Sequence, residues 1–131
     1  MWFLKNRKMS NVKRTVRDNL RYISFDELIR IVYLAYIDVD CDHIEYEVPF
    51  KFDNGMHKIG MTYDRNCAPA DGVVHTNYIS FYVDDQVFKT ITELRFNAEL
   101  QGVKLLDVHM LSFGVTPEYY QILQYGEFTY E

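Results

Sequence analysis

The sequence has few of the features that fix a protein's class or compartment at first sight. Its 131 residues contain only 2 cysteines, Cys41 and Cys67, which form no C-x-x-C motif, so we expect reduced thiols and no disulfide framework. No window approaches 18 uninterrupted apolar residues, and the first residues lack the long apolar region of a secretory signal. These absences predict a cytoplasmic protein that does not enter a membrane.

The motifs of several large enzyme classes are missing as well. The chain has no G-x-x-x-x-G-K-[ST] phosphate-binding loop, no G-x-G-x-x-G dinucleotide motif, no H-E-x-x-H zinc motif and no G-x-S-x-G nucleophile motif. No motif of a known family is recognisable. The sequence therefore favours a protein that is not an enzyme, and it predicts neither a cofactor nor a bound metal ion.

Apolar and aromatic residues, in contrast, are plentiful. They make up 48% and 16% of the chain, which is enough to build one globular domain with its own core. The net charge of −5 is unevenly placed, because residues 1–21 hold seven of the 14 basic and one of the 19 acidic side chains. We therefore divide the chain into a basic N-terminal arm, residues 1–21, and a single acidic α+β domain, residues 22–131.

The arm has a net charge of +6 and the rest of the chain a net charge of −11. Its apolar Val12 and Val16, and its basic Lys13 and Arg17, each recur at a spacing of four, which predicts a short basic amphipathic helix over residues 11–21. This asymmetry is typical of chains that bind a polyanion or an acidic surface. The same charges also allow the arm to fold back onto its own negative body.

The first long element of the domain is predicted over residues 25–37. Ser24 and Glu27 form a capping-box pattern, and a wide apolar face follows, so we expect a mostly buried helix. Residues 43–52 then alternate apolar and polar side chains, which indicates a half-buried antiparallel strand. Pro49 lacks the N–H of a ladder bond, which places this strand at a sheet edge or at a bulge.

Two further strands and a helix are expected in the middle of the chain. The turn residues Asp53-Asn54-Gly55 lead into a strand over 57–64, and residues 76–83 form the next strand. A tight reversal at 84–85 leads to a short strand. Thr90 and Glu93 repeat the capping-box pattern and open a helix over residues 91–100.

The last third of the chain is predicted to add a strand, a helix and a closing strand. Residues 103–111 alternate, with Leu106, Val108 and Met110 pointing inward. Pro117 is typical of the first position of a helix, which would stop at Tyr125-Gly126 before a strand over 127–131. A strand from residue 121 onward is the alternative.

These elements predict an α+β fold. We expect a mainly antiparallel sheet of five to six strands, packed by two or three helices, that can curl into a small partly closed barrel.

The stretch "DVDCDHIE", residues 38–45, has the densest set of potential ligands. A calcium loop starting at Asp38 would need glycine where His43 stands and glutamate where Pro49 stands, so that interpretation fails. A zinc site has Cys41 and His43 but no second paired spacing. We interpret the stretch as a solvated acidic corner between helix and strand, with a divalent-ion site as the alternative.

Catalytic groups are scattered rather than linked by a motif. Asp107 and His109 would share one face of the strand over 103–111, where aspartate can orient a histidine base. Cys67 lies in a loop that suits a reactive thiol, and a metal-free ribonuclease could combine histidine with lysine. The candidates for that ribonuclease are His57, His75 and His109 with Lys58 or Lys104. A small hydrolase or nuclease is therefore the third functional hypothesis.

Tyrosine is the other unusual feature, with 11 residues. Exposed tyrosines beside basic residues suit stacking on unpaired bases, so the leading hypothesis is a non-enzymatic regulatory module that binds RNA or single-stranded nucleic acid. The residues assigned to nucleic-acid contact are Lys5, Arg7, Lys8, Lys13, Arg14, Arg17, Arg21, Tyr78 and Tyr82.

The second hypothesis is a protein-interaction or inhibitor module whose acidic, tyrosine-rich surface docks on a basic partner, even as a mimic of nucleic acid. An edge strand near Pro49 also allows a homodimer.

Overall fold

The structure is a computed structural model that describes residues 19–130, with side chains described up to residue 124. Within these residues it contains three α-helices, a six-stranded sheet and a two-stranded sheet, and every strand pair is antiparallel. The α+β prediction is confirmed, and the sheet is not closed into a barrel.

The strands are β1 (Arg21–Ile23), β2 (Tyr46–Phe52), β3 (Gly55–Tyr63), β4 (Ile79–Val83), β5 (Gln86–Phe88), β6 (Glu99–Leu100), β7 (Val103–Lys104) and β8 (Phe113–Val115). The helices are α2 (Phe25–Ile37), α3 (Ile91–Asn97) and α4 (Pro117–Tyr130), with 3-10 turns at Thr76–Tyr78 and Leu105–Asp107.

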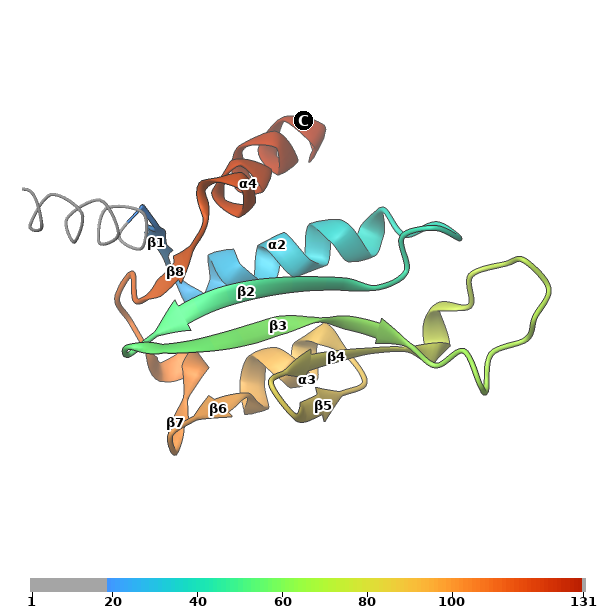
Figure 1. Cartoon of the computed structure of the whole chain (residues 1–131), viewed down its shortest axis with the longest axis horizontal. Helices are drawn as coiled ribbons and strands as arrows, with labels where there is room; N and C mark the ends of the chain where they lie inside the picture. Colours follow the sequence, from blue (N-terminus) through green and yellow to red (C-terminus); the bar gives the residue numbers. More distant parts are fainter. Residues whose placement is uncertain (1–18, 131) are drawn as a thin grey trace, which may run out of the picture.

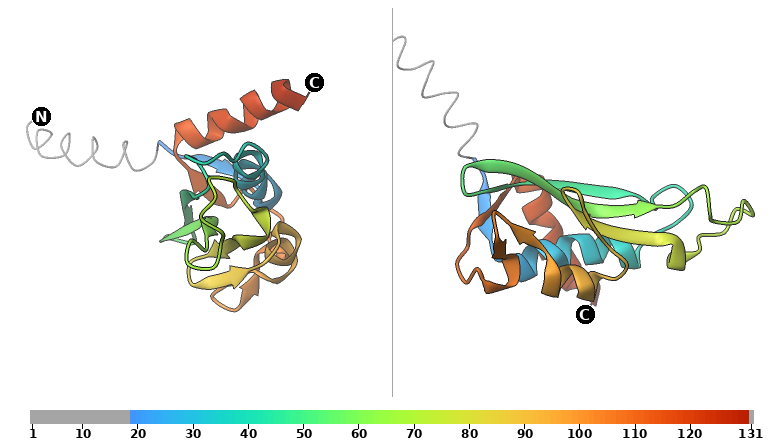
Figure 2. Two further views of the ribbon diagram at one scale, coloured as in Figure 1. Left: turned by 90° about the vertical axis from the view of Figure 1, so that its right-hand side faces the viewer. Right: turned by 90° about the horizontal axis from the view of Figure 1, so that it is seen from below.

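The large sheet has the strand order β1-β8-β2-β3-β4-β5, and the helices lie on one side of it (Figures 1 and 2). α2 packs on β2 and β3, α3 packs on β4 and β5, and α4 packs on α2. The core lies between the helices and the strands, where burial of apolar area is the main favourable free energy of folding. None of the helices in the described part of the chain is long and apolar enough to span a bilayer.

Helix α2 has the bounds that its sequence predicts. The Ser24 hydroxyl accepts a hydrogen bond from the Glu27 N–H at 3.2 Å, and the Glu27 carboxylate accepts one from the Ser24 N–H at 3.0 Å. This reciprocal capping satisfies two N–H groups that the helix itself leaves without partners. The buried side chains of α2 are Phe25, Leu28, Ile29, Ile31 and Val32.

The predicted hairpin is confirmed as β2 and β3, although β2 begins at Tyr46 instead of residue 43 and β3 covers Gly55–Tyr63 instead of 57–64. Asp53 and Asn54 have φ angles of 49° and 68°, the left-handed values of a two-residue turn. The turn sets the register, with Phe52 opposite Gly55, and the period of two then places Ile59 and Met61 in the core. The strand predicted over 76–83 begins only at Ile79, after a 3-10 turn.

β2 is an inner strand of the sheet and not the edge strand that Pro49 predicts, but its neighbour β8 pairs with it at Lys51 alone. β8 pairs with β2 at Lys51, and Tyr119 of α4 donates a hydrogen bond to the Glu47 carbonyl from the same side. Pro49 has the same parity as these two residues, so its nitrogen points to that side, where no described strand covers it. The missing N–H therefore breaks no ladder bond.

The expected strand over residues 103–111 is wrong. β7 covers only Val103–Lys104, a 3-10 turn follows, and Leu105 is the buried residue instead of its neighbours. Met110, predicted to point inward, is 74% exposed. The expected helix over 91–100 ends at Asn97, because the chain enters the β6–β7 hairpin, where Gly102 has a φ of 76°.

The two ends of the domain also differ from the prediction. Helix α4 begins at Pro117 as expected but continues to Tyr130, so neither the stop at Tyr125-Gly126 nor the closing strand exists. The sheet is completed instead by β1 and β8, two strands of three residues each that the sequence did not indicate. The helix predicted over 11–21 cannot extend to residue 21, because Arg21 begins β1. Residues 11–18 of that prediction lie outside the described chain.

Candidate functional site: the open face of the sheet

One face of the large sheet carries no helix in the described structure (Figure 2). The period of two sends every second side chain of β2 to β5 to this side, away from the core. We call it the open face, and define it by Glu47, Pro49, Lys51, Met56, Lys58, Gly60, Thr62, Ser80, Tyr82 and Val87. Val87 and Met56 are 65% and 66% exposed, so apolar side chains stand in solvent on this face.

A row of three residues crosses the centre of the open face. Gly60 of β3 lies opposite Glu47 of β2 on one side and opposite Tyr82 of β4 on the other. Because Gly60 has no side chain, Tyr82 reaches across β3 and its hydroxyl donates a hydrogen bond of 2.6 Å to the Glu47 carboxylate. A Cβ atom on Gly60 would lie 2.1 Å from the Tyr46 carbonyl oxygen and 2.8 Å from the Tyr82 hydroxyl. The row therefore depends on glycine at this position.

The electrostatics of the row keep Tyr82 neutral. Partial burial, and then the hydrogen bond to Glu47, raise the pKa of Tyr82 well above its usual range. The hydroxyl thus remains a donor at physiological pH, and a Glu47 carboxylate oxygen is its acceptor. The backbone carbonyl of Glu47 also accepts a hydrogen bond from Tyr119 at 3.4 Å, which ties α4 to the same residue.

A shallow hollow of about 560 Å³ opens beside this row. Its lining includes three carboxylates, those of Glu45, Glu47 and Asp84, but only one ammonium group, that of Lys58. Each carboxylate is already oriented, Glu45 by Arg65 at 2.9 Å, Glu47 by Tyr82 and Asp84 by His57 at 2.7 Å. The hollow therefore presents fixed negative groups next to the exposed Val87, a surface that suits cationic side chains and disfavours phosphate.

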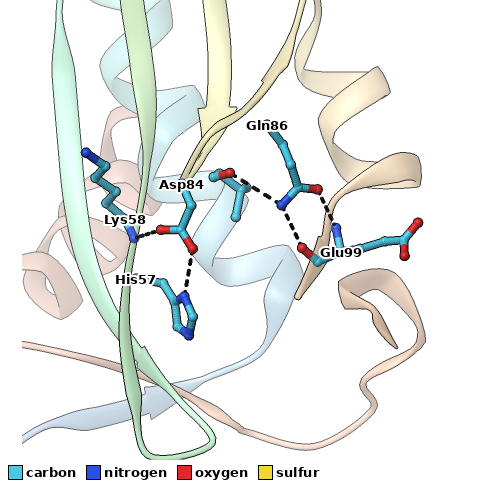
Figure 3. A network of polar contacts seen from close by, with 6 residues as sticks. His57, Lys58, Asp84, Gln86 and Glu99 are labelled. Carbon is cyan, nitrogen blue, oxygen red and sulfur yellow. Dashed lines mark hydrogen bonds and ion pairs between the residues drawn. The ribbon is translucent and has the colours of Figure 1, made fainter. Parts of the chain in front are cut away.

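A partly buried network supports the turn end of the open face (Figure 3). Asp84, at φ 52° in the β4–β5 turn, accepts hydrogen bonds from the His57 ring Nδ1 and from the Lys58 N–H. The His57 ring points into the core beside Phe50 and Phe52, and its Nε2 is buried without a partner in the described structure. A histidine bonded to an aspartate is the arrangement of many catalytic bases. The Nε2 atom of His57, however, is closed off from solvent and cannot take a proton from a substrate. The bond of the His57 ring to Asp84 holds the β4–β5 turn against β3.

Gln86 closes the outer edge of the sheet at β5. Its side-chain amide donates to the Glu99 carbonyl at 2.7 Å and accepts from the Glu99 N–H at 2.9 Å, which imitates the pairing of a further strand (Figure 3). Capping of this kind protects an edge strand from pairing with another chain. At this end of the sheet, the open face and not the strand edge is therefore available to a partner.

The aspartate stretch forms the acidic corner that the sequence predicts. Asp40 accepts hydrogen bonds from the N–H groups of Asp42 and His43 and from the His43 ring, all at 2.8 to 3.0 Å. These bonds, that of Asp42 first, lower the pKa of Asp40. Among residues 19–124, no three His, Cys, Asp or Glu side chains are grouped to hold a metal ion.

The other catalytic candidates are not brought together. Asp107 lies in a 3-10 turn and His109 in the loop after it, both are exposed, and no hydrogen bond joins them in the described structure. Asp64 raises the pKa of the Cys67 thiol through a hydrogen bond, which disfavours the reactive thiolate. His57 is enclosed, and His75 pairs with Asp71 at 3.0 Å on a different loop.

The predicted nucleic-acid site is only partly placed. Lys5, Arg7, Lys8, Lys13, Arg14 and Arg17 lie outside the described residues. Arg21 is exposed on β1, whereas Tyr82 lies on β4, four strand positions away or about 19 Å across the sheet. Tyr78 is half-buried and contacts the His75 ring edge-on. The structure thus places Tyr82, but not Arg21, on the open face.

No protein-family model, no curated protein and no solved structure matches the chain. Function must therefore be argued from the geometry of the site.

Proposed function

We propose that the protein is a non-enzymatic protein-interaction module that binds an extended cationic segment of a partner on the open face. The observation that carries this proposal is the row of Glu47, Gly60 and Tyr82 with the hollow beside it. A face that served only to cover the core would need neither a glycine in the middle of a strand nor a hydroxyl held over it.

The charges and the rigidity of the face support a cationic partner. Glu45, just before β2, and Glu47, within it, line the hollow together with Asp84, where the one ammonium group is that of Lys58. The carboxylates are held by hydrogen bonds before any partner arrives, which reduces the entropy lost on binding. The net charge of −11 on residues 22–131 adds long-range attraction for basic segments.

The test uses a fluorescent 12-residue peptide of alternating lysine and valine, titrated into the full chain. We expect Val87→Lys, on the open face, to weaken binding by about tenfold. Val73→Lys is the matched control, because Val73 is similarly exposed at 59% but lies in the loop after β3, and it adds the same charge. Equal losses in the two variants would show that net charge alone binds the peptide, and the proposal would be abandoned.

Binding of RNA or single-stranded nucleic acid is the second candidate, and its support is the +6 charge of residues 1–21. We propose that such binding would use the arm, because Tyr82 is engaged by Glu47 and phosphate would face three carboxylates in the hollow. A single-stranded 12-nucleotide RNA should then bind with steep salt dependence and equally well to Val87→Lys. Absence of RNA binding at low salt would remove this candidate.

A further inference from the structure

We infer that residues 1–18 of the chain are themselves an occupant of the open face and compete there with an external partner. This inference rests on the proposed function of that face, and it names the segment that the face binds in the free protein. Residues 1–18 would thus act as an internal competitor, and their affinity for the open face would set how strongly a partner must bind to displace them.

The first support is chemical complementarity. Residues 1–18 carry six basic side chains and one acidic side chain, a net charge of +5, and they begin with the apolar run Trp2-Phe3-Leu4. The hollow offers the opposite set, three carboxylates to one ammonium group, with Val87 exposed beside it. The segment therefore has the combination of cationic and apolar side chains that the open face selects.

The second support is reach. The described chain begins at Asn19, two residues before β1, and β1 is two strands from β2, which corresponds to about 10 Å. The longest strand, β3, spans about 30 Å. Eighteen residues can extend to about 60 Å, so the segment can lie along the whole face. A tether of this length gives an effective concentration in the millimolar range.

Other acidic surfaces are less suited to the segment. Asp40, Asp64 and Asp71 lie in the stretches at 38–43 and 64–75, outside the strands, so they offer no sheet face along which an extended segment could lie. The outer edge of β5 is closed by Gln86. The open face combines fixed carboxylates with the exposed Val87 on adjacent strands of one sheet.

Zero-length carbodiimide cross-linking of the full chain tests the contact directly. We expect amide links from Lys5, Lys8 or Lys13 to Glu45 or Glu47, identified by mass spectrometry, and loss of the Glu47 links in Glu47→Gln. Lys104, exposed on β7, is the control that should form no such link. Links from the arm spread evenly over all carboxylates, or no links at all, would overturn the inference. Links between isotope-labelled and unlabelled chains would overturn it in favour of a second copy.

Competition gives an independent readout. A full chain with Lys5, Lys8, Lys13, Arg14 and Arg17 all changed to Gln should bind the lysine–valine peptide about tenfold more tightly than the wild type. Equal affinity, with the peptide still sensitive to Val87→Lys, would overturn this inference and leave the proposed function intact. Absence of peptide binding to either chain would overturn both.

Discussion

The two faces of the same sheet follow different rules. On the covered face, Val48, Phe50, Ile59, Phe81 and Val83 are at most 3% exposed. On the open face the same strands carry charged groups, a tyrosine held by a glutamate and an exposed valine. Burial of apolar area explains the first set, whereas the second set needs another reason. The face without helices is therefore the one on which we propose that a partner binds.

The largest expected difference between the faces is in stability. Phe50→Ala should lower the free energy of unfolding by about 3 to 5 kcal/mol, because Phe50 is fully buried and contacts Phe113 and the His57 ring. Val87→Ala should change it by less than about 0.5 kcal/mol. Urea denaturation of both variants measures the contrast, and similar values would contradict the assignment of the two faces.

The centre of the open face is the exception to this rule. Gly60→Ala should cost about 3 kcal/mol, because the new Cβ would strike the backbone of Tyr46. Gly72→Ala is the control: that glycine has a φ of 78° but open space around it, so we expect a loss of about 1 kcal/mol. If the two glycines cost the same, the close approach of β2 and β3 at Gly60 would be wrong.

Loss of the bond between Tyr82 and Glu47 should have a smaller effect on stability. Tyr82→Phe should cost about 1 kcal/mol, the usual value of one hydrogen bond. Glu47→Gln should lower the raised pKa of Tyr82 toward its ordinary value of 10.0, since it removes the adjacent charge. A raised folded pKa means that the bond stabilises the fold below pH 10 and is lost as pH rises through the folded value. Ultraviolet titration of tyrosine in wild type and variants checks this.

The smallest expected effect is a local loss of stability at acidic pH. Asp40, Asp64 and Asp71 have pKa values lowered from 3.8, mainly by hydrogen bonds from nearby backbone N–H groups at Asp40 and Asp71 and by Cys67 at Asp64. A lowered folded pKa stabilises the fold above pH 3.8, and the contribution disappears as pH falls through the folded values. Hydrogen exchange between pH 5 and pH 3 should therefore show the corner at 38–43 and the loop at 64–75 loosening before β2 and β3. Simultaneous loosening would contradict this order.

Much of the fold was predictable because local signals agreed. The capping box set the start of α2, and the Asp53-Asn54 turn set both the hairpin and its register. The missed strands β1 and β8 are three residues long, too short for periodicity to show. The alternation of residues 103–111 was accidental, since Leu105 breaks it by entering the core from a 3-10 turn.

Two residue pairs of the open face could be predicted from the sequence, but not the complete row across three strands. A glycine inside a strand signals close approach, and the two-residue turn already fixes Glu47 opposite Gly60. The same reasoning places Val87 opposite Tyr82 across the second turn. The pair Glu47–Gly60 and the pair Tyr82–Val87 are brought together by the register of β3 and β4. That register cannot be read from the sequence, because the long irregular stretch at residues 64–75 separates the two strands. The row across three strands therefore needed the structure.

The most direct test of the central claim is nuclear magnetic resonance of the isotope-labelled full chain during titration with the lysine–valine peptide. We expect shift changes concentrated at Glu47, Thr62, Tyr82 and Val87, with little change in the loop at 64–75. Changes confined to that loop or to the corner at 38–43, or no changes at all, would contradict the central claim.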